Sequence, residues 1–464
     1  MPDGSPSPNA LIPLLVALAA LLAATGCDVH YPVNPPLARH DPGYGHRFEN
    51  SRMRPDQSAD VLVVLLISGG GTRAAALAYG ALESLRDTRI RVSGKEERLL
   101  DEVDYISAVS GGSAVAAYYG LYHERLFDDF GERFLYRDVQ GELTSKLARN
   151  VWRIAFSRYG RGDLLADYLD EQIFSGATFR DLAHRPQPFV VISATDMSLG
   201  AQFPFSQERF DLLCSDLGEV PVARAVAASM ALPPYFSPLT FRNYAGECGF
   251  QAPSWFEGHP GIDERTQRDL KEMHSYLDRT RRPYVHLFDG GLVDNLSLRQ
   301  PMGLVMRRGG LATALEAFGF HDVRHAVFIA VDAERDSTFE LDRDGDVPGP
   351  LATIDALGNV FNLGSFDSSV MVDEAVARWR EELLAARSAG APEVKFYLID
   401  ASLRSITDPA ERERFMSIPT TLHLERKDVD DLRALARRLI TAAPDFQALM
   451  QDIGAPGAVT ATEK

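Results

Sequence analysis

The chain has 464 residues and 45% hydrophobic composition, enough for one large catalytic domain or two domains of ordinary size. Acidic residues outnumber basic ones 65 to 48, and the formal net charge of -17 argues against nucleic acid or anionic lipid headgroups as partners bound through charge alone. The 9% aromatic content excludes wholesale disorder. The three cysteines, Cys27, Cys214 and Cys248, are too few for a disulfide scaffold and have no CxxC spacing, so no metal site is indicated, and no pattern indicates a cofactor.

An apolar run from Ala10 to Ala24 stands near the start of the chain and leads into Thr25-Gly26-Cys27. It is shorter than the roughly 20 residues that cross a bilayer as a helix, and it suits the apolar region of a signal peptide over residues 1–26. The small residues before the cysteine resemble the lipobox of bacterial lipoproteins, which implies that Cys27 is acylated. Residues 1–26 contain no Lys or Arg, so a simple export signal, a misplaced start codon and a buried helix remain alternatives.

Export of this kind predicts a lipoprotein of the bacterial cell envelope, anchored to a membrane on the periplasmic side. Asp28 resembles an inner-membrane retention signal of some Gram-negative bacteria. In an oxidising compartment Cys214 and Cys248 can form one disulfide bond, or they can remain two free buried thiols. Residues 27–58 mix Pro, Arg, His and Asn without an apolar period, and we interpret them as a tether. The sequence identifies no protein partner.

Between the tether and a frayed tail over residues 452–464, short β-branched runs alternate with helical patterns. Most runs are apolar on both faces, which is typical of a buried and mainly parallel sheet. We therefore expect an α/β domain over residues 59–445, with helices over 125–180, an insertion over 244–283 that can cover an active site, and a closing helix from Val429 to Ile440. The expected strands are Val61 to Ile67, Val103 to Val109, Phe189 to Thr195, Tyr284 to Phe288, Ala326 to Asp332 and Val394 to Ile399.

The first segment that carries chemistry is Ser68-Gly69-Gly70-Gly71-Thr72-Arg73-Ala74, between an expected strand and an expected helix. Glycines let the backbone approach a ligand closely and point several N–H groups at it, and a helix N-terminus favours an anion. The segment lacks the Lys-Ser/Thr of a P-loop and the spacing of GxGxxG, so a developing oxyanion fits it better than a phosphate. A tight turn without a ligand is the alternative.

The second segment contains Ala108-Val109-Ser110-Gly111-Gly112. A strand that leads into Ser110 and a helix just after it would place the hydroxyl on a sharp turn, as in a nucleophile elbow. Compared with the pattern G-x-S-x-G, Ala108 replaces the first glycine and Gly112 keeps the second. A Ser-Gly-Gly triplet is also common in ordinary loops.

The third segment is Phe288-Asp289-Gly290-Gly291, followed closely by Asp294. An aspartate at a strand end lies on the edge where α/β sheets bind ligands. The alternative is that Asp289 or Asp294 only organises a turn through hydrogen bonds from its side chain to the backbone.

In this order the three segments resemble the patatin-like phospholipase family, relatives of the cytosolic phospholipases A2, with its G-G-G-x-R/K, G-x-S-x-G and D-G-G/A motifs. Ala228 to Pro238 also resembles the family's A-S-x-A-x-P-x-x-F segment, and the likeness spans about residues 59–300 and extends to Pro419-Thr420-Thr421. The resemblance implies a patatin-like α/β fold with a mainly parallel central sheet flanked by helices, a nucleophile elbow, and helical or loop insertions. It also implies that Ser110 is the nucleophile and Asp289 its acidic partner. The implied oxyanion hole consists of Gly69, Gly70, Gly71 and Arg73.

These roles imply a serine acyl hydrolase that cleaves phospholipid, lysophospholipid or related acyl esters through a Ser/Asp dyad and an acyl-enzyme, without a metal ion. A carboxylate with an ordinary pKa of about 4 is a weak base, so the site must raise that pKa or transfer the proton only as the tetrahedral intermediate forms. Two alternatives remain. One is an α/β-hydrolase-type triad that uses His321 or His325, and the other is a catalytically silent envelope lipoprotein.

Overall fold

The computed structural model describes residues 34–51, 57–186, 188–253, 256, 264–335, 371–372, 374–388, 391 and 393–455. The predicted signal peptide, Cys27 and residues 456–464 of the predicted tail lie outside these residues. The predicted start of the tail at residue 452 is wrong, because α16 (Pro444–Ile453) extends past it and the Ala455 N–H donates to the Arg89 carbonyl oxygen at 3.2 Å. Ten strands are described: β1 (Val61–Ile67), β2 (Arg89–Val92), β3 (Lys95–Arg98), β4 (Val103–Val109), β5 (Phe189–Asp196), β6 (Ala201–Pro204), β7 (Leu239–Arg242), β8 (Tyr284–Phe288), β9 (His325–Asp332) and β10 (Lys395–Ser402). The six predicted strands are therefore confirmed, three of them to the residue.

The described strands form one large sheet in the order β10-β9-β1-β4-β5-β8-β7, with β6 also paired to β5, and a separate β2-β3 hairpin. Strands β10, β9, β1, β4 and β5 run parallel. Strands β6 and β8 pair antiparallel with β5, and β7 pairs antiparallel with β8. The sheet is thus mainly parallel, as predicted, and its antiparallel strands gather at one side.

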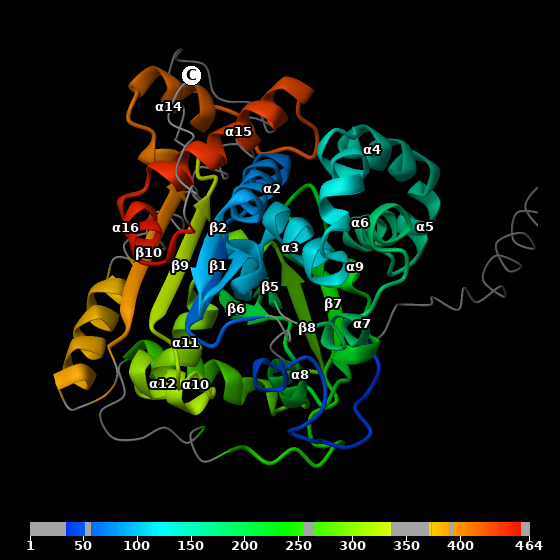
Figure 1. Cartoon of the computed structure of the whole chain (residues 1–464). Coiled ribbons are helices and arrows are strands. Elements are labelled where there is room, and N and C mark those ends of the chain that lie inside the picture. The colour runs from blue at the N-terminus through cyan, green and yellow to red at the C-terminus, as the bar shows by residue number, and fades with distance from the viewer. Residues whose placement is uncertain are drawn as a thin grey trace, which may run out of the picture.

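Helices cover both faces of this sheet (Figure 1). Alternate residues of β1 belong to two separate apolar clusters, one on each face, because successive side chains of a strand point in opposite directions. One cluster includes α2 (Gly71–Asp87), α3 (Ser110–Tyr122), α9 (Val222–Ser229), α15 (Arg426–Ala442) and α16 (Pro444–Ile453). The other includes α11 (Arg299–Arg307), α12 (Leu311–Ala317) and a helix over 374–388. This double coverage explains the strands that are apolar throughout.

The predicted helical region 125–180 and the predicted closing helix are both present. The region contains π-helical segments at Leu126–Leu135 and Asp170–Phe174, and the α-helices α4 (Val139–Arg149), α5 (Val151–Phe156), α6 (Arg161–Leu169) and α7 (Phe179–Ala183). Helix α15 packs so closely on α2 that a Cβ added to Gly80 would lie 2.4 Å from the Arg433 carbonyl oxygen. The remaining helices are α8 (Gln207–Leu212), α10 (Glu264–Tyr276) and α14 (Pro409–Met416).

The described part of the predicted insertion 244–283 lines a cavity of about 560 Å³ together with the N-terminal segment, α8 and α11. Neither Ser110 nor Asp289 lines this cavity. Its wall includes Phe189, which starts β5 and lies level with Tyr105, whereas Ser110 follows the opposite end of β4. The described part of the insertion therefore encloses a different cavity from the one it was expected to cover.

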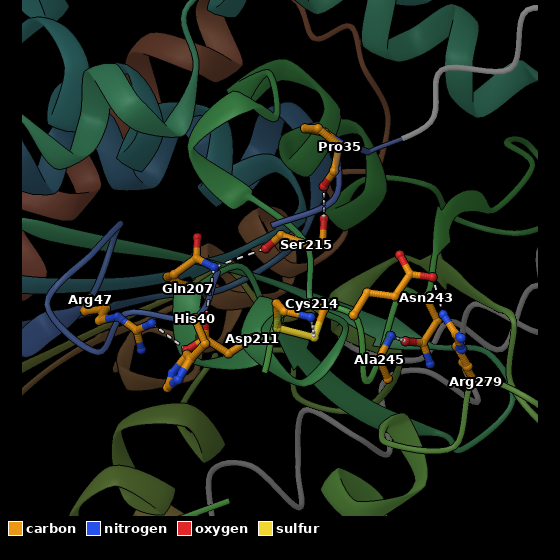
Figure 2. The surroundings of a disulfide bond; sticks show 12 residues. Pro35, His40, Arg47, Gln207, Asp211, Cys214, Ser215, Asn243, Ala245 and Arg279 are labelled. Atoms are coloured by element: carbon orange, nitrogen blue, oxygen red, sulfur yellow. Dashed lines mark hydrogen bonds and ion pairs between the residues drawn. A yellow bond between two sulfur atoms is a disulfide. The ribbon is translucent and has the colours of Figure 1, made fainter. Parts of the chain in front are cut away.

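Residues 34–50 run back along the domain and are held to a disulfide bond (Figure 2). Cys214 and Cys248 are bonded with Cα atoms 5.3 Å apart, so of the two alternatives the structure has the disulfide. The Leu37 N–H donates to the Cys214 carbonyl oxygen at 2.7 Å, and the His40 N–H donates to that of Cys248 at 2.8 Å. Arg47 adds a buried ion pair with Asp211. Residues 34–50 of the predicted tether thus form a strap that is fixed to the domain.

Within the described residues, no helix combines the length and the apolar character that a membrane crossing requires.

The disulfide closes a loop with a sequence separation of 34 residues. Replacing Cys214 and Cys248 together by Ser should lower the free energy of unfolding by about 3 to 4 kcal/mol, since the cross-link restricts the unfolded chain. Denaturant unfolding with and without reductant measures this. The double variant should no longer respond to reductant, and an equal response in parent and variant would contradict a disulfide.

Candidate active site

Ser110 stands at the junction of β4 and α3 with φ of +47°, a left-handed conformation that is rare for residues other than glycine. Its N–H donates a 2.7 Å hydrogen bond to Ser229 Oγ, which holds the turn. The next two residues must be glycines. A Cβ on Gly111 would lie 1.9 Å from the Gly71 carbonyl oxygen, and one on Gly112 would lie 2.5 Å from that of Ser68. The strand, turn and helix together form a nucleophile elbow with Ser110 at its tip.

Asp289 reaches Ser110 because of the register of the sheet. Ser193 of β5 lies level with Val109, and β8 enters antiparallel with Phe288 opposite Thr195. The residue after β8 therefore lies beside the residue after β4. Ser110 Oγ donates a 2.9 Å hydrogen bond to Asp289 Oδ2, while the Gly291 N–H donates to Oδ1 at 2.9 Å.

The Asp289 carboxyl group is only 6% exposed. Burial disfavours the ionised form and raises its pKa from 3.8 to about 7, although the hydrogen bonds from Gly291 and Ser110 act in the opposite direction. A carboxylate with a pKa of this size is a useful general base near neutral pH. Of the two routes that the dyad hypothesis left open, the raised pKa is the one that burial of Asp289 favours.

The glycine loop lies against the elbow, and its N–H groups are not equivalent. The Gly69 N–H donates to the Asn295 carbonyl oxygen at 3.0 Å, and that of Thr72 donates to Thr421 at 2.9 Å. The N–H groups of Gly70 and Gly71 form no hydrogen bond within the described part of the chain, and both residues have positive φ, 139° and 60°. Of the three predicted glycine donors, two therefore remain for an oxyanion.

A further N–H group belongs to this set. Gly71 and Ser110 are the first residues of α2 and α3, so two helix N-termini meet at the site, and the Gly111 N–H lies in the first turn of α3. N–H groups in a first turn have no acceptor within their own helix, and the helix dipole favours an anion there. The residue after the nucleophile is a usual oxyanion donor in elbow enzymes, and our sequence analysis missed it.

Arg73 does not have the position expected of a direct oxyanion donor. Its side chain is 2% exposed, Nε donates to the Ala333 carbonyl oxygen at 2.9 Å, and Nη1 donates to that of Ile418. Burial lowers the pKa of its guanidinium to about 10. Nη2 lies 3.1 Å from where a Cβ on Gly70 would stand. The geometry makes Arg73 a positioning residue that supports the glycine loop from behind.

Two other residues hold the site together and were not singled out by the sequence. Ser229 accepts the Ser110 N–H and donates to the Ser193 carbonyl oxygen at 2.6 Å, so it links the elbow to β5. Asn295 accepts the Gly69 N–H through its backbone, and its Oδ1 lies 2.6 Å from a Cβ position on Gly69 and 2.7 Å from one on Gly291. Ser229 belongs to the A-S-x-A-x-P-x-x-F block, which was the available signal.

The histidines of the triad alternative lie at the wrong end of the sheet. His325 is the first residue of β9 and lies level with Val61 and Lys395, the first residues of β1 and β10. It therefore lies at the N-terminal ends of the parallel strands. Ser110 follows the C-terminal end of β4. The two ends of such a strand are roughly 20 Å apart, at about 3.3 Å per residue. His321 is exposed in the loop before β9. The triad hypothesis with either histidine is therefore wrong. Asp294 accepts hydrogen bonds from the Gln202 side chain and from the Arg299 N–H, whereas the Ser110 hydroxyl donates to Asp289.

No set of three or more His, Cys, Asp or Glu side chains in the described ranges is arranged to hold a metal ion.

Comparison with solved structures finds several similar chains. The human GIVD cytosolic phospholipase A2 is 12% identical with a TM-score of 0.40, over 85% of this chain and 62% of that one. Its complex with methyl gamma-linolenyl fluorophosphonate and terbium chloride is 13% identical with a TM-score of 0.39, over 86% and 60%. VipD from Legionella pneumophila is 11% identical with a TM-score of 0.25, over 90% and 73%. The chain spans less than two thirds of the length of the human enzyme chains.

No curated protein matches the sequence. A sequence model of the patatin-like phospholipase family, in contrast, matches residues 65–302, which is just over half of the chain and includes the glycine loop, the elbow and Asp289. The fold, the order of the motifs and this match agree, and the chain belongs to the patatin-like phospholipase family.

Proposed function

We propose that the protein is a serine acyl hydrolase that cleaves acyl esters of phospholipids or lysophospholipids through a dyad of Ser110 and Asp289. The observation that carries the proposal is the 2.9 Å hydrogen bond from Ser110 Oγ to a buried carboxyl group with a pKa of about 7. Family membership supports the lipid substrate class.

In the proposed reaction Ser110 Oγ attacks the ester carbonyl carbon and its proton passes to Asp289 Oδ2. The oxyanion receives hydrogen bonds from the N–H groups of Gly70, Gly71 and Gly111, which need no rearrangement at that moment. Asp289 then returns the proton to the leaving alkoxide, and the acyl group stays on Ser110. Water attacks this acyl-enzyme and gives its proton to Asp289. Asp289 then returns that proton to Ser110 Oγ as the bond to the acyl group breaks and the fatty acid leaves.

The dyad is tested by single and double substitution. Ser110→Ala and Asp289→Asn should each lower ester hydrolysis by about 1,000-fold or more, and the double variant should lose little beyond either one, because the two side chains act as a unit. Release of fatty acid from a mixed lipid extract, followed by mass spectrometry, measures the loss. His321→Ala and His325→Ala are matched controls that should keep parental rates. Full activity of Ser110→Ala would contradict the proposal.

The pKa of Asp289 predicts the pH dependence of the rate. Only the ionised carboxylate accepts the Ser110 proton, so kcat/KM should fall as the pH decreases through about 7 and level off above it. For stability the sign is reversed. A folded pKa above the unfolded one favours the protonated form, and this stabilisation is lost as the pH rises through about 7. Asp289→Asn should therefore have a Tm at pH 8 no lower than that of the parent, which separates lost chemistry from lost folding.

We further propose that the protein is exported and anchored through an acylated Cys27. The lipobox-like Thr25-Gly26-Cys27 supports this, and so does the disulfide between Cys214 and Cys248, because such bonds persist in oxidising compartments.

Replacing Cys27 by Ala should move the protein from the membrane fraction to a soluble or mislocalised form, since an acyl chain provides an anchor that a net charge of -17 does not. Cell fractionation with metabolic labelling by a fatty-acid analogue measures both effects. The same fractionation and labelling in the parent and in Cys27→Ala would refute the anchor.

A further inference from the structure

Helix α5 exposes an unusual amount of apolar surface. Val151, Trp152 and Phe156 are 52%, 71% and 69% exposed, and they account for three of the seven large apolar side chains that are exposed among the described residues. The Trp152 and Phe156 rings stack with centroids 5.5 Å apart and planes at 12°. Figure 1 shows α5 at the outer edge of the group formed by α4, α5 and α6. Apolar patches of this kind mark an interaction site.

The stretch of sequence that contains this patch has a charge opposite to that of the whole protein. Residues 143–162 contain five basic side chains and no Asp or Glu, in a chain of net charge -17. Lys146 pairs with Glu171, and Arg153 lies 3.9 Å from Asp167. Arg149 and Arg158 are exposed and form no ion pair with another described residue. The charged side chains of residues 143–162 are thus all basic, and Arg149 and Arg158 have no acidic partner among the described residues.

The helix after α5 contacts a segment that reaches the active site. Ser229 and Ala231 contact the dyad, since Ser229 Oγ accepts the Ser110 N–H and the Ala231 carbonyl oxygen accepts that of Asp289. A few residues later, Pro234 accepts from Arg161, and Ser237 Oγ accepts the Gly162 N–H at 3.0 Å. Tyr235, which is 51% exposed, lies between these contacts. Helix α6, which follows α5 in the chain after four residues, therefore contacts the same segment that contacts the dyad.

We propose that Val151, Trp152 and Phe156, with Arg149 and Arg158, form a docking surface for membranes that contain anionic phospholipid. We call it the α5 surface. Tryptophan favours the membrane interface, where its ring is apolar and its N–H stays hydrated. Each cation near an anionic bilayer contributes roughly fivefold in affinity. Docking of this kind would bring the proposed active site to substrate in a bilayer. The purpose of the docking rests on the proposed function, but the docking itself does not. The acidic surface of a second copy is the competing occupant.

Quenching of Trp152 fluorescence by lipids with brominated acyl chains tests insertion of this side chain itself. The protein is the full chain with Ser110→Ala to prevent hydrolysis and Trp255→Phe to remove a second fluorophore, and Trp379 is 1% exposed and so out of reach. Vesicles of brominated phosphatidylcholine with phosphatidylglycerol should quench and blue-shift the emission, and vesicles without phosphatidylglycerol should do so more weakly. Absence of quenching overturns the proposal even if an anchor holds the protein on the vesicles.

Charge reversal tests the cationic part of the α5 surface. Arg149→Glu with Arg158→Glu should raise the lipid concentration for half-maximal quenching by roughly tenfold or more with anionic vesicles. Arg268→Glu with Arg281→Glu, two exposed arginines elsewhere, is the charge-matched control and should change it little. If both pairs of substitutions raise this lipid concentration equally, only the net charge of the protein matters, and the cationic part of the proposal is wrong. A blue shift that depends on protein concentration without lipid would identify a second copy as the occupant.

Removal of the aromatic pair separates this proposal from the proposed function. Trp152→Ser with Phe156→Ser, in the active chain, should lower hydrolysis of anionic vesicles at least tenfold and leave hydrolysis of a soluble short-chain ester unchanged. Leu384→Ser, at a residue that is 61% exposed on another helix, is the control. If the parent hydrolyses neither substrate while Trp152 is quenched, the catalytic proposal fails and the docking proposal stands. Equal loss on both substrates overturns docking.

Discussion

The backbones of Gly71 and Gly111 touch where the turn after β1 meets the turn after β4, and the active site depends on this contact. A Cβ on Gly111 would lie 1.9 Å from the Gly71 carbonyl oxygen, so no side chain fits there. The contact brings the N-termini of α2 and α3 together, and with them the N–H groups that can receive an oxyanion. Ser229, Asn295 and Arg73 then hold the two turns from outside through hydrogen bonds to backbone groups. The reactive atoms are thus positioned mostly by backbone packing.

Burial acts on the two charged side chains near the site in different ways. Asp289 has few hydrogen bonds to compensate for lost hydration, so its pKa rises to about 7. Arg73 is equally buried, but it donates to the carbonyl oxygens of Ala333 and Ile418. Its pKa falls only to about 10, and the guanidinium remains charged at neutral pH. The same low dielectric environment therefore produces one base and one fixed cation.

Sequence reasoning predicted the features that follow from local pattern. Apolar runs located β1, β4 and β8 to the residue. Strands β1 and β4 are covered on both faces and so are buried throughout, whereas β8 alternates exposed and buried residues. The direction of β8 is not a local property, since it follows from the pairing of Phe288 with Thr195 in the folded sheet. The same holds for Ser229 and Asn295, whose roles exist only through contacts with residues distant in the sequence. Arg73 was assigned to the oxyanion from its motif position, but its side chain has carbonyl partners that no motif contains.

Whole-chain averages also hide local arrangement. The net charge of -17 describes the molecule at a distance, whereas a membrane meets one face at close range, within the ~8 Å over which salt screens charge. Residues 143–162 contribute only positive charge to such a face.

The strap over residues 34–50 gives the molecule a defined mechanical attachment. Asn34 bonds to Ser215 Oγ and to the Arg242 carbonyl oxygen, and the Leu37 and His40 N–H groups bond to the two halves of the disulfide. Tension applied to the chain ahead of residue 34 therefore loads the cross-linked loop first. That loop resists opening through a covalent bond, while β1, which leads directly to the glycine turn, lies behind it in the chain and is shielded from the pull. If the proposed anchor at Cys27 holds the protein on a bilayer, thermal motion transmitted through the chain ahead of residue 34 would reach this loop before it reaches β1.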